Sequence, residues 1–131
     1  MKVEEQLVAS CDFSYASGFR AASRLITEHR PTAIVTGADL MALGAIDAAR
    51  SCGLTVPADF SMVGFDDLPQ AAQSFPGLTT VRQPLHDMGQ KAARALLSVI
   101  DGQNLLMEHM EVGTELVVRN STAPPPGGGG R

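Results

Sequence analysis

Short apolar runs alternate along the chain with longer stretches whose apolar residues recur every three or four positions. The short runs are typical of strands buried in a parallel sheet, and the longer stretches are typical of amphipathic helices. We predict strands over residues 6–10, 33–36, 60–65, 78–82, 107–112 and 115–118. With helices between them, this order predicts an α/β fold with a doubly wound, mostly parallel sheet.

Local signals mark the ends of the predicted helices. Ser14 is a candidate N-cap for a first helix, which Pro31 ends. A second helix follows Asp39, and Gly53 suits its C-terminal cap. Residues 68–74 are irregular or weakly helical, and residues 85–100 form a last helix.

The last predicted helix has an apolar face that is too broad to be left in water. This face consists of Leu85, Met88, Ala92, Leu96 and Ile100. The helix follows a Gln-Pro joint, and it needs a partner surface beyond those that the first half of the chain uses.

Length and charge limit the possible functions. The chain has 131 residues, which suits one domain, and a net charge of −4 without a cluster of Lys or Arg. Contact with nucleic-acid phosphates needs a basic surface, so any role in DNA binding must come from residues outside this chain. No apolar run reaches the roughly 18 residues of a membrane helix, and no signal peptide is visible, so we expect a cytoplasmic protein without membrane contact.

Cysteine and histidine give no sign of a metal or of another cofactor. Cys11 and Cys52 form neither a disulfide framework nor a zinc set, and we expect two buried thiols. His29, His86 and His109 are far apart in the sequence and fit solvated or helix-terminal positions better than a metal pair.

Two carboxylates directly follow the predicted strand over residues 60–65. Open α/β sheets bind ligands in the crevice at the carboxyl ends of their strands. Asp66 is therefore a candidate ligand contact, with a solvated loop as the alternative, and Asp67 fits a structural capping role better. No His or third carboxylate is suitably spaced for catalysis, so binding is favoured over an enzyme that acts, for instance, on glycosides.

Other polar and aromatic residues fall at the same predicted edge. Asp39 follows the strand over residues 33–36 and is either a helix cap or a ligand contact. Phe13 follows the first predicted strand, where its ring can stack on a sugar or belong to the core. Gln83 follows the strand over residues 78–82 and precedes Pro84. The chain therefore looks like a sensor of small molecules rather than a catalyst.

These residues together resemble the C-terminal part of the effector-binding core of LacI/GalR-family transcription regulators. The matching segments occur in the family's order and cover residues 5–123 almost completely. They are CDFS and SGF (11–14 and 17–19), PTAIV (31–35), DLMALGA (39–45), VPADFSMVGFDD (56–67), LTTVRQP (78–84) and LVVRNST (116–122).

The resemblance implies a protein with a helix-turn-helix, a hinge helix and two Rossmann-like lobes of the type I periplasmic-binding fold. A small effector, a sugar or nucleobase in many members, binds between the lobes and changes the DNA affinity of a homodimer. Residues 1–84 would belong to the C-terminal lobe without its first strand and helix. Residues 85–102 would form a crossover helix packed on the absent N-terminal lobe, 103–123 the closing strands and 124–131 a disordered Pro/Gly tail.

Matching the chain to the family position by position implies roles for individual residues. Phe13 matches the aromatic residue that stacks on the effector, Asp66 the acidic residue that binds it, and Gln83 a polar contact at the crossover. Asp39 matches a recurrent position at which capping and effector contact are both open. Ala38 stands where many members have Asn or Ser, which leaves that contact and the effector class open.

The resemblance also places a dimer interface on the helix that contains Leu43 and on the segment from Gln70 to Phe75. A periplasmic sugar-binding protein shares the fold and is the alternative from another functional class. The segments around Thr79–Pro84 and Leu116–Thr122 favour the regulator.

Overall fold

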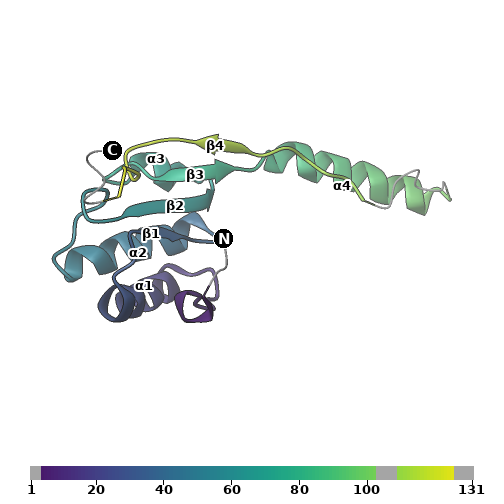
Figure 1. The fold of residues 1–131 in the computed structure, drawn as a ribbon. Coiled ribbons are helices and arrows are strands. Elements are labelled where there is room, and N and C mark those ends of the chain that lie inside the picture. Colours follow the sequence, from purple (N-terminus) through teal and green to yellow (C-terminus); the bar gives the residue numbers. More distant parts are fainter. Residues whose placement is uncertain (1–3, 103–108, 126–131) are drawn as a thin grey trace.

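The computed structural model describes residues 4–102 and 109–125. A sheet in the order β1-β2-β3-β4 lies at its centre. Its strands are β1 (Ala33–Val35), β2 (Ser61–Asp66), β3 (Thr79–Arg82) and β4 (Glu115–Val117). The first three run parallel, and β4 runs antiparallel to β3 (Figure 1). The predicted α/β fold with a mostly parallel sheet is confirmed.

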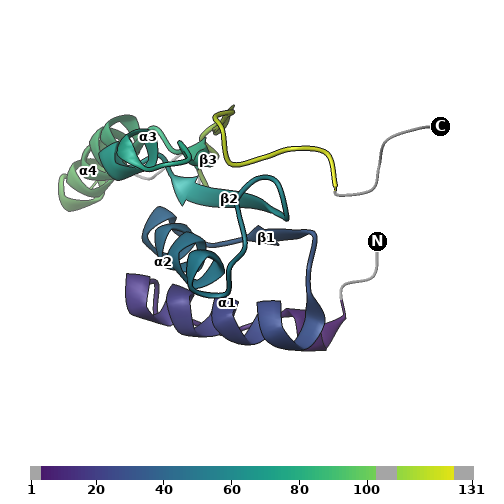
Figure 2. The same ribbon diagram turned by 90° about the vertical axis from the view of Figure 1, so that its left-hand side faces the viewer.

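In the described part of the chain, the helices are a short 3-10 turn and four α-helices. They are η1 (Glu5–Leu7), α1 (Tyr15–His29), α2 (Asp39–Ser51), α3 (Pro69–Gln73) and α4 (Leu85–Ile100). Helices α1 and α2 lie on one side of the sheet, as Figure 2 shows. α3 adds Ala71 to the same core, whose largest fully buried apolar side chains are Phe60, Met62 and Leu78.

The ends of α1 and α2 follow the signals in the sequence. Ser14 precedes α1, and its Oγ accepts a hydrogen bond of 3.1 Å from the backbone N–H of Ser17. Arg30 then takes a left-handed conformation, and Pro31 prevents the helix from continuing. After α2, Gly53 has a φ of 75°, which glycine adopts at little cost.

Two glycines let α1 and α2 touch at the backbone. A Cβ atom on Gly18 would lie 2.3 Å from the carbonyl oxygen of Met41, and one on Gly44 would lie 2.1 Å from that of Tyr15. No side chain fits at such distances. Close contact between the two helices therefore depends on glycine at both positions.

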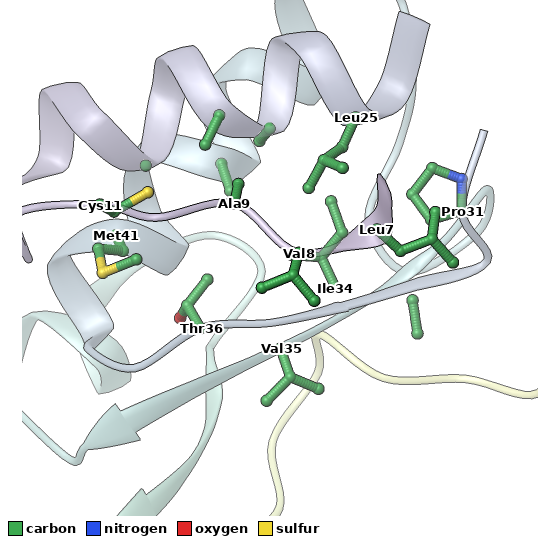
Figure 3. Close-up of a pocket in the computed structure, with 15 residues that line it drawn as sticks. Leu7, Val8, Ala9, Cys11, Leu25, Pro31, Ile34, Val35, Thr36 and Met41 are labelled. Atoms are coloured by element: carbon green, nitrogen blue, oxygen red, sulfur yellow. The ribbon is translucent and has the colours of Figure 1, made fainter. Parts of the chain in front are cut away.

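Two strand predictions are wrong for the described residues. Residues 6–10 begin in a 3-10 turn and continue as chain that pairs with no strand among the described residues, although β1 stands at the edge of the sheet. Leu7 and Val8 instead line an apolar cavity of about 280 Å³ between α1 and β1 (Figure 3). Residues 109–112 form no strand, and residues 107 and 108 lie outside the described part. Residues 126–131, which belong to the predicted disordered tail, also lie outside the described part.

Helix α4 forms as predicted but is not packed. It extends from the end of β3 away from the sheet (Figure 1), and none of its residues is buried. The side chain of Leu96 is 61% exposed and that of Ile100 is 69% exposed. The apolar face of α4 therefore has no partner among the described residues.

Within residues 4–102 and 109–125, no helix combines the length and the apolar character that crossing a membrane requires.

Candidate functional site

The carboxyl ends of the three parallel strands meet at one edge of the sheet. β1 ends at Val35, β2 at Asp66 and β3 at Arg82, and the last two residues are register partners. Helix α4 leaves from the same edge after Gln83 and Pro84 (Figure 1). This is the edge at which the sequence predicts a ligand site.

Phe13 lies at this edge, beside the turn that follows β1. A Cβ atom built on Gly37 would lie 3.3 Å from Cε1 of the Phe13 ring. The residue has a φ of 63°, and its side chain is 64% exposed. An exposed ring held against a glycine offers a flat apolar surface, and it is not part of the core.

Asp66 and Gln83 are brought together across the ends of β2 and β3. Nε2 of Gln83 donates a hydrogen bond of 2.7 Å to Oδ1 of Asp66. Both residues are half-buried. Asp66 has a φ of 116°, an unfavourable value for a residue with a side chain. The bond leaves the second carboxylate oxygen, Oδ2, without a donor among the described residues.

Asp67 points to two arginines instead. Nη2 of Arg119 lies 2.6 Å from Oδ1 of Asp67, and Nε of Arg82 lies 2.6 Å from Oδ2. Burial alone would raise the pKa of Asp67, but the hydrogen bonds and charges of Arg119 and Arg82 outweigh it and lower the pKa. The carboxylate ties the β2 corner to β3 and to the segment after β4. The role is structural, as predicted, but Asp67 does not cap α3, whose N-cap is Leu68 without a side-chain hydrogen bond.

Asp39 lies behind the edge, fully buried at the first position of α2. Its Oδ1 accepts a hydrogen bond of 2.5 Å from Oγ1 of Thr80, and its Oδ2 accepts one of 2.7 Å from the backbone N–H of Leu68. Burial raises its pKa, the charges of Asp66 and Asp67 add to this, and the two hydrogen bonds oppose it. Ala38, not Asp39, occupies the N-cap position, and Ala38 is buried as well.

The sequence therefore locates Phe13, Asp66 and Gln83 at one edge, and the structure adds their partners. Sequence reasoning missed Thr80, Arg82 and Arg119. Arg119 lies 52 positions after Asp67, and no local pattern connects the two. Among residues 4–102 and 109–125, no group of three or more His, Cys, Asp or Glu side chains is arranged to hold a metal ion.

The residues predicted for a dimer interface lie on a different surface. Leu43 is half-buried against the core, whereas Gln70 is exposed and the side chain of Phe75 is 86% exposed. Arg50 of α2 donates to the carbonyl oxygen of Phe75 and pairs with Asp47 at 2.6 Å.

Tyr15 of α1 donates its hydroxyl hydrogen to Asp47. This hydrogen bond to the Asp47 carboxylate raises the pKa of Tyr15. α1, α2 and the loop after α3 thus share one continuous surface.

Comparison with known proteins gives a consistent picture. The model of the family "Periplasmic binding protein-like domain" matches residues 2–122. The HTH-type transcriptional regulator MalR of Streptomyces coelicolor is 50% identical over 129 residues, which are 98% of this chain and 37% of MalR. The chain thus spans just over a third of this relative.

Solved structures agree with this match. The chain resembles the transcriptional regulator CelR in its complex with cellobiose, with a TM-score of 0.87 and 36% identity over 92% of this chain and 37% of CelR. It also resembles a dimeric Lac repressor, with a TM-score of 0.80 and 36% identity over 88% of this chain and 42% of the repressor. These relatives are transcription regulators, neither enzymes nor periplasmic binding proteins.

Proposed function

Because the chain belongs to the periplasmic binding protein-like domain family, in the form found in LacI/GalR-type regulators, we propose that it is the effector-sensing part of a DNA-binding transcription regulator. The observation that carries this proposal is the pairing of Asp66 with Gln83 at the carboxyl edge of the sheet, the edge that also carries the exposed Phe13. DNA contact belongs to a helix-turn-helix outside this chain. We infer a cytoplasmic location, where such a regulator meets DNA.

The effector that fits this edge best is a sugar-like molecule with hydroxyl groups and an apolar face. Oδ2 of Asp66 can accept a hydrogen bond from a hydroxyl, and Gln83 can donate to one. The ring of Phe13 can stack on the apolar face. Asp39 has both carboxylate oxygens occupied inside the protein, so we assign it no direct contact.

The open edge of β1 supports the proposed absence of the lobe's first strand and helix from this chain. Val35 of β1 is 75% exposed, although strands of parallel sheets are usually covered on both faces. In a doubly wound sheet of order 2-1-3, the first strand lies between the second and the third. A strand placed on β1 would give residues 6–10 the neighbour that they lack and would fill the cavity of Figure 3.

The exposed apolar face of α4 supports the proposal that this helix packs on a second, N-terminal lobe. We assign residues 1–84 to the C-terminal lobe and residues 85–102 to a crossover helix that packs on an N-terminal lobe. We assign residues 103–123 to the closing part of the lobe, in which β4 pairs with β3. Effector binding between the two lobes would favour one arrangement of them and so change the grip of a dimer on DNA.

A thermal-shift screen of sugars and nucleobases on the full-length parent protein tests the function. We expect a sugar to raise the melting temperature, since a ligand that binds only the folded state stabilises it. Asp66→Ala should abolish that shift, and Thr27→Ala, on the exposed surface of α1, should preserve it. If no compound acts, or if Asp66→Ala responds like the wild type, the proposed site is wrong.

We propose that the homodimer interface includes Leu43, Gln70 and Phe75. The exposed Phe75 continues the surface formed by α1 and α2, and the solved relatives include a dimeric repressor. Phe75→Glu in the parent protein should weaken dimerisation by about tenfold or more, because it replaces a large apolar contact with a charge. Analytical ultracentrifugation measures this effect. Thr27→Glu, which adds the same charge at an exposed position of α1 outside the three interface residues, should leave the dimer intact, and equal effects of the two changes would contradict the assignment.

A further inference from the structure

The corner that carries Asp66 is held at both ends by one buried side chain. We propose that Asp39 is a positioning residue for effector recognition: it fixes the corner from Gly64 to Leu68 so that Asp66 faces Gln83. The inference rests on the proposed function of Asp66 and extends it to a residue that does not touch the effector.

The first end of the corner is fixed by close packing. A Cβ atom on Gly64 would lie 2.3 Å from Oδ1 of Asp39, so this carboxylate lies directly against the β2 backbone. The same oxygen accepts from Oγ1 of Thr80, which is also fully buried. Asp39 therefore holds β2 and β3 against the start of α2 at the point where both strands approach the site.

The second end is fixed by a hydrogen bond. Oδ2 of Asp39 accepts from the backbone N–H of Leu68, the residue that precedes α3. Between these two anchors, Asp66 has a φ of 116° and Asp67 a φ of 57°. Such conformations persist only where the surrounding structure imposes them. The arginines that pair with Asp67 hold the middle of the corner, and Asp39 holds its ends.

The Asp66–Gln83 bond gives a readout that needs no effector. NMR of the side-chain amide of Gln83 in the 131-residue chain reports whether Nε2 still donates to Asp66. Asp66→Asn gives the reference spectrum for the altered bond. In Asp39→Ala, we expect the Gln83 amide signals to move toward those of a free amide. Amide exchange at Leu68 should accelerate by about tenfold or more, because its acceptor is lost.

Matched variants separate positioning from general stabilisation. Ser121 is fully buried at the opposite end of the sheet, where it accepts from Thr79 and donates to Met62. Ser121→Ala should lower the melting temperature without moving the Gln83 signals. Asp39→Asn should rescue them, because its amide oxygen can accept from Leu68 while its nitrogen donates to Thr80.

Thr80→Val keeps the shape of the side chain but removes one of the two hydrogen-bond donors to Asp39. If Asp39→Ala does not fold, this variant tests the positioning role in its place. Its expected result is a partial shift of the Gln83 signals. Unchanged Gln83 signals in folded Asp39→Ala, or in Thr80→Val where Asp39→Ala is unfolded, would overturn the proposal.

Effector affinity completes the test in the parent protein, with cellobiose as the first probe and the sugar panel after it. Asp39→Ala should raise the Kd by about tenfold in the wild-type background and cause no further loss in Asp66→Asn, as expected for residues that act as a unit. Equal losses in both backgrounds would overturn the inference. If no compound of the panel binds, the proposed function fails, whereas the NMR result still decides whether Asp39 positions the corner.

Discussion

Replacing Gly44 with alanine is expected to lower the free energy of unfolding by about 3 kcal/mol, at the upper end of the usual cost of overpacking. The new Cβ would lie 2.1 Å from the carbonyl oxygen of Tyr15 and 2.9 Å from the backbone nitrogen of Phe19. Both neighbours are backbone atoms of α1, so no rotation of a side chain can relieve the clash. The helices must separate, and Ala22, Ile26 and Ala45 lose their packing.

Urea unfolding of the 131-residue chain, followed by circular dichroism, measures this effect. The matched control is Gly89→Ala in α4, where a Cβ would meet no atom within 4 Å beyond its own stretch of the helix backbone. That change should stabilise the helix by up to about 1 kcal/mol, because alanine is the better helix former. Similar results for the two glycines would contradict the close contact of α1 with α2. Gly18→Ala, facing the carbonyl of Met41, should behave like Gly44→Ala.

The close contact between α1 and α2 also shows where prediction from sequence ends. Apolar spacing and capping residues located both helices, because these signals act between residues a few positions apart. Nothing local indicates that Gly18 and Gly44 face the backbone of another helix. Sequence patterns therefore predicted the helices but not how closely they pack.

In the candidate site too, local sequence patterns predicted the residues but not their tertiary partners. Asp66 and Gln83 were predicted from their places after neighbouring strands, and the hydrogen bond between them needs the parallel register of β2 with β3. The sequence left Asp39 as either a helix cap or a ligand contact. The structure shows that it is a buried acceptor of hydrogen bonds from Thr80 and Leu68, which lie 41 and 29 positions away in the sequence. Such pairings arise from tertiary packing and leave no periodic signal.

The wrong strand at residues 6–10 has a different cause. Its apolar residues suit a strand, but a strand also needs a partner within hydrogen-bonding reach, and these residues pair with none of the described strands. The apolar pattern therefore predicts a strand whose pairing partner is not among the described residues. The apolar face of α4 likewise has no partner among the described residues, as the proposed second lobe would explain.

That face leads to the second large effect: the 131-residue chain alone is expected to bind the effector about 100-fold or more weakly than the parent protein. Half of the proposed binding cleft is missing, and a cleft that buries most of a ligand gains its affinity from both walls. The exposed Leu85, Leu96 and Ile100 should also drive self-association. Each such side chain gains roughly 1.5–3 kcal/mol when it is fully buried.

Isothermal titration with the sugar that stabilises the parent measures the affinity, and analytical ultracentrifugation measures the association. Leu96→Lys combined with Ile100→Lys should make the isolated chain monomeric, because the charges cannot be buried against a second copy. In the parent protein, the same pair should destabilise the fold by several kcal/mol, at roughly 2 kcal/mol for each lost apolar contact.

The control is Gln90→Lys, which adds a charge at an exposed polar position of α4 and removes no apolar surface. It should affect neither association of the isolated chain nor stability of the parent. A monomeric isolated chain that binds the sugar as tightly as the parent would contradict both parts of the argument. The site would then be complete without a second lobe, and the apolar face of α4 would need no partner.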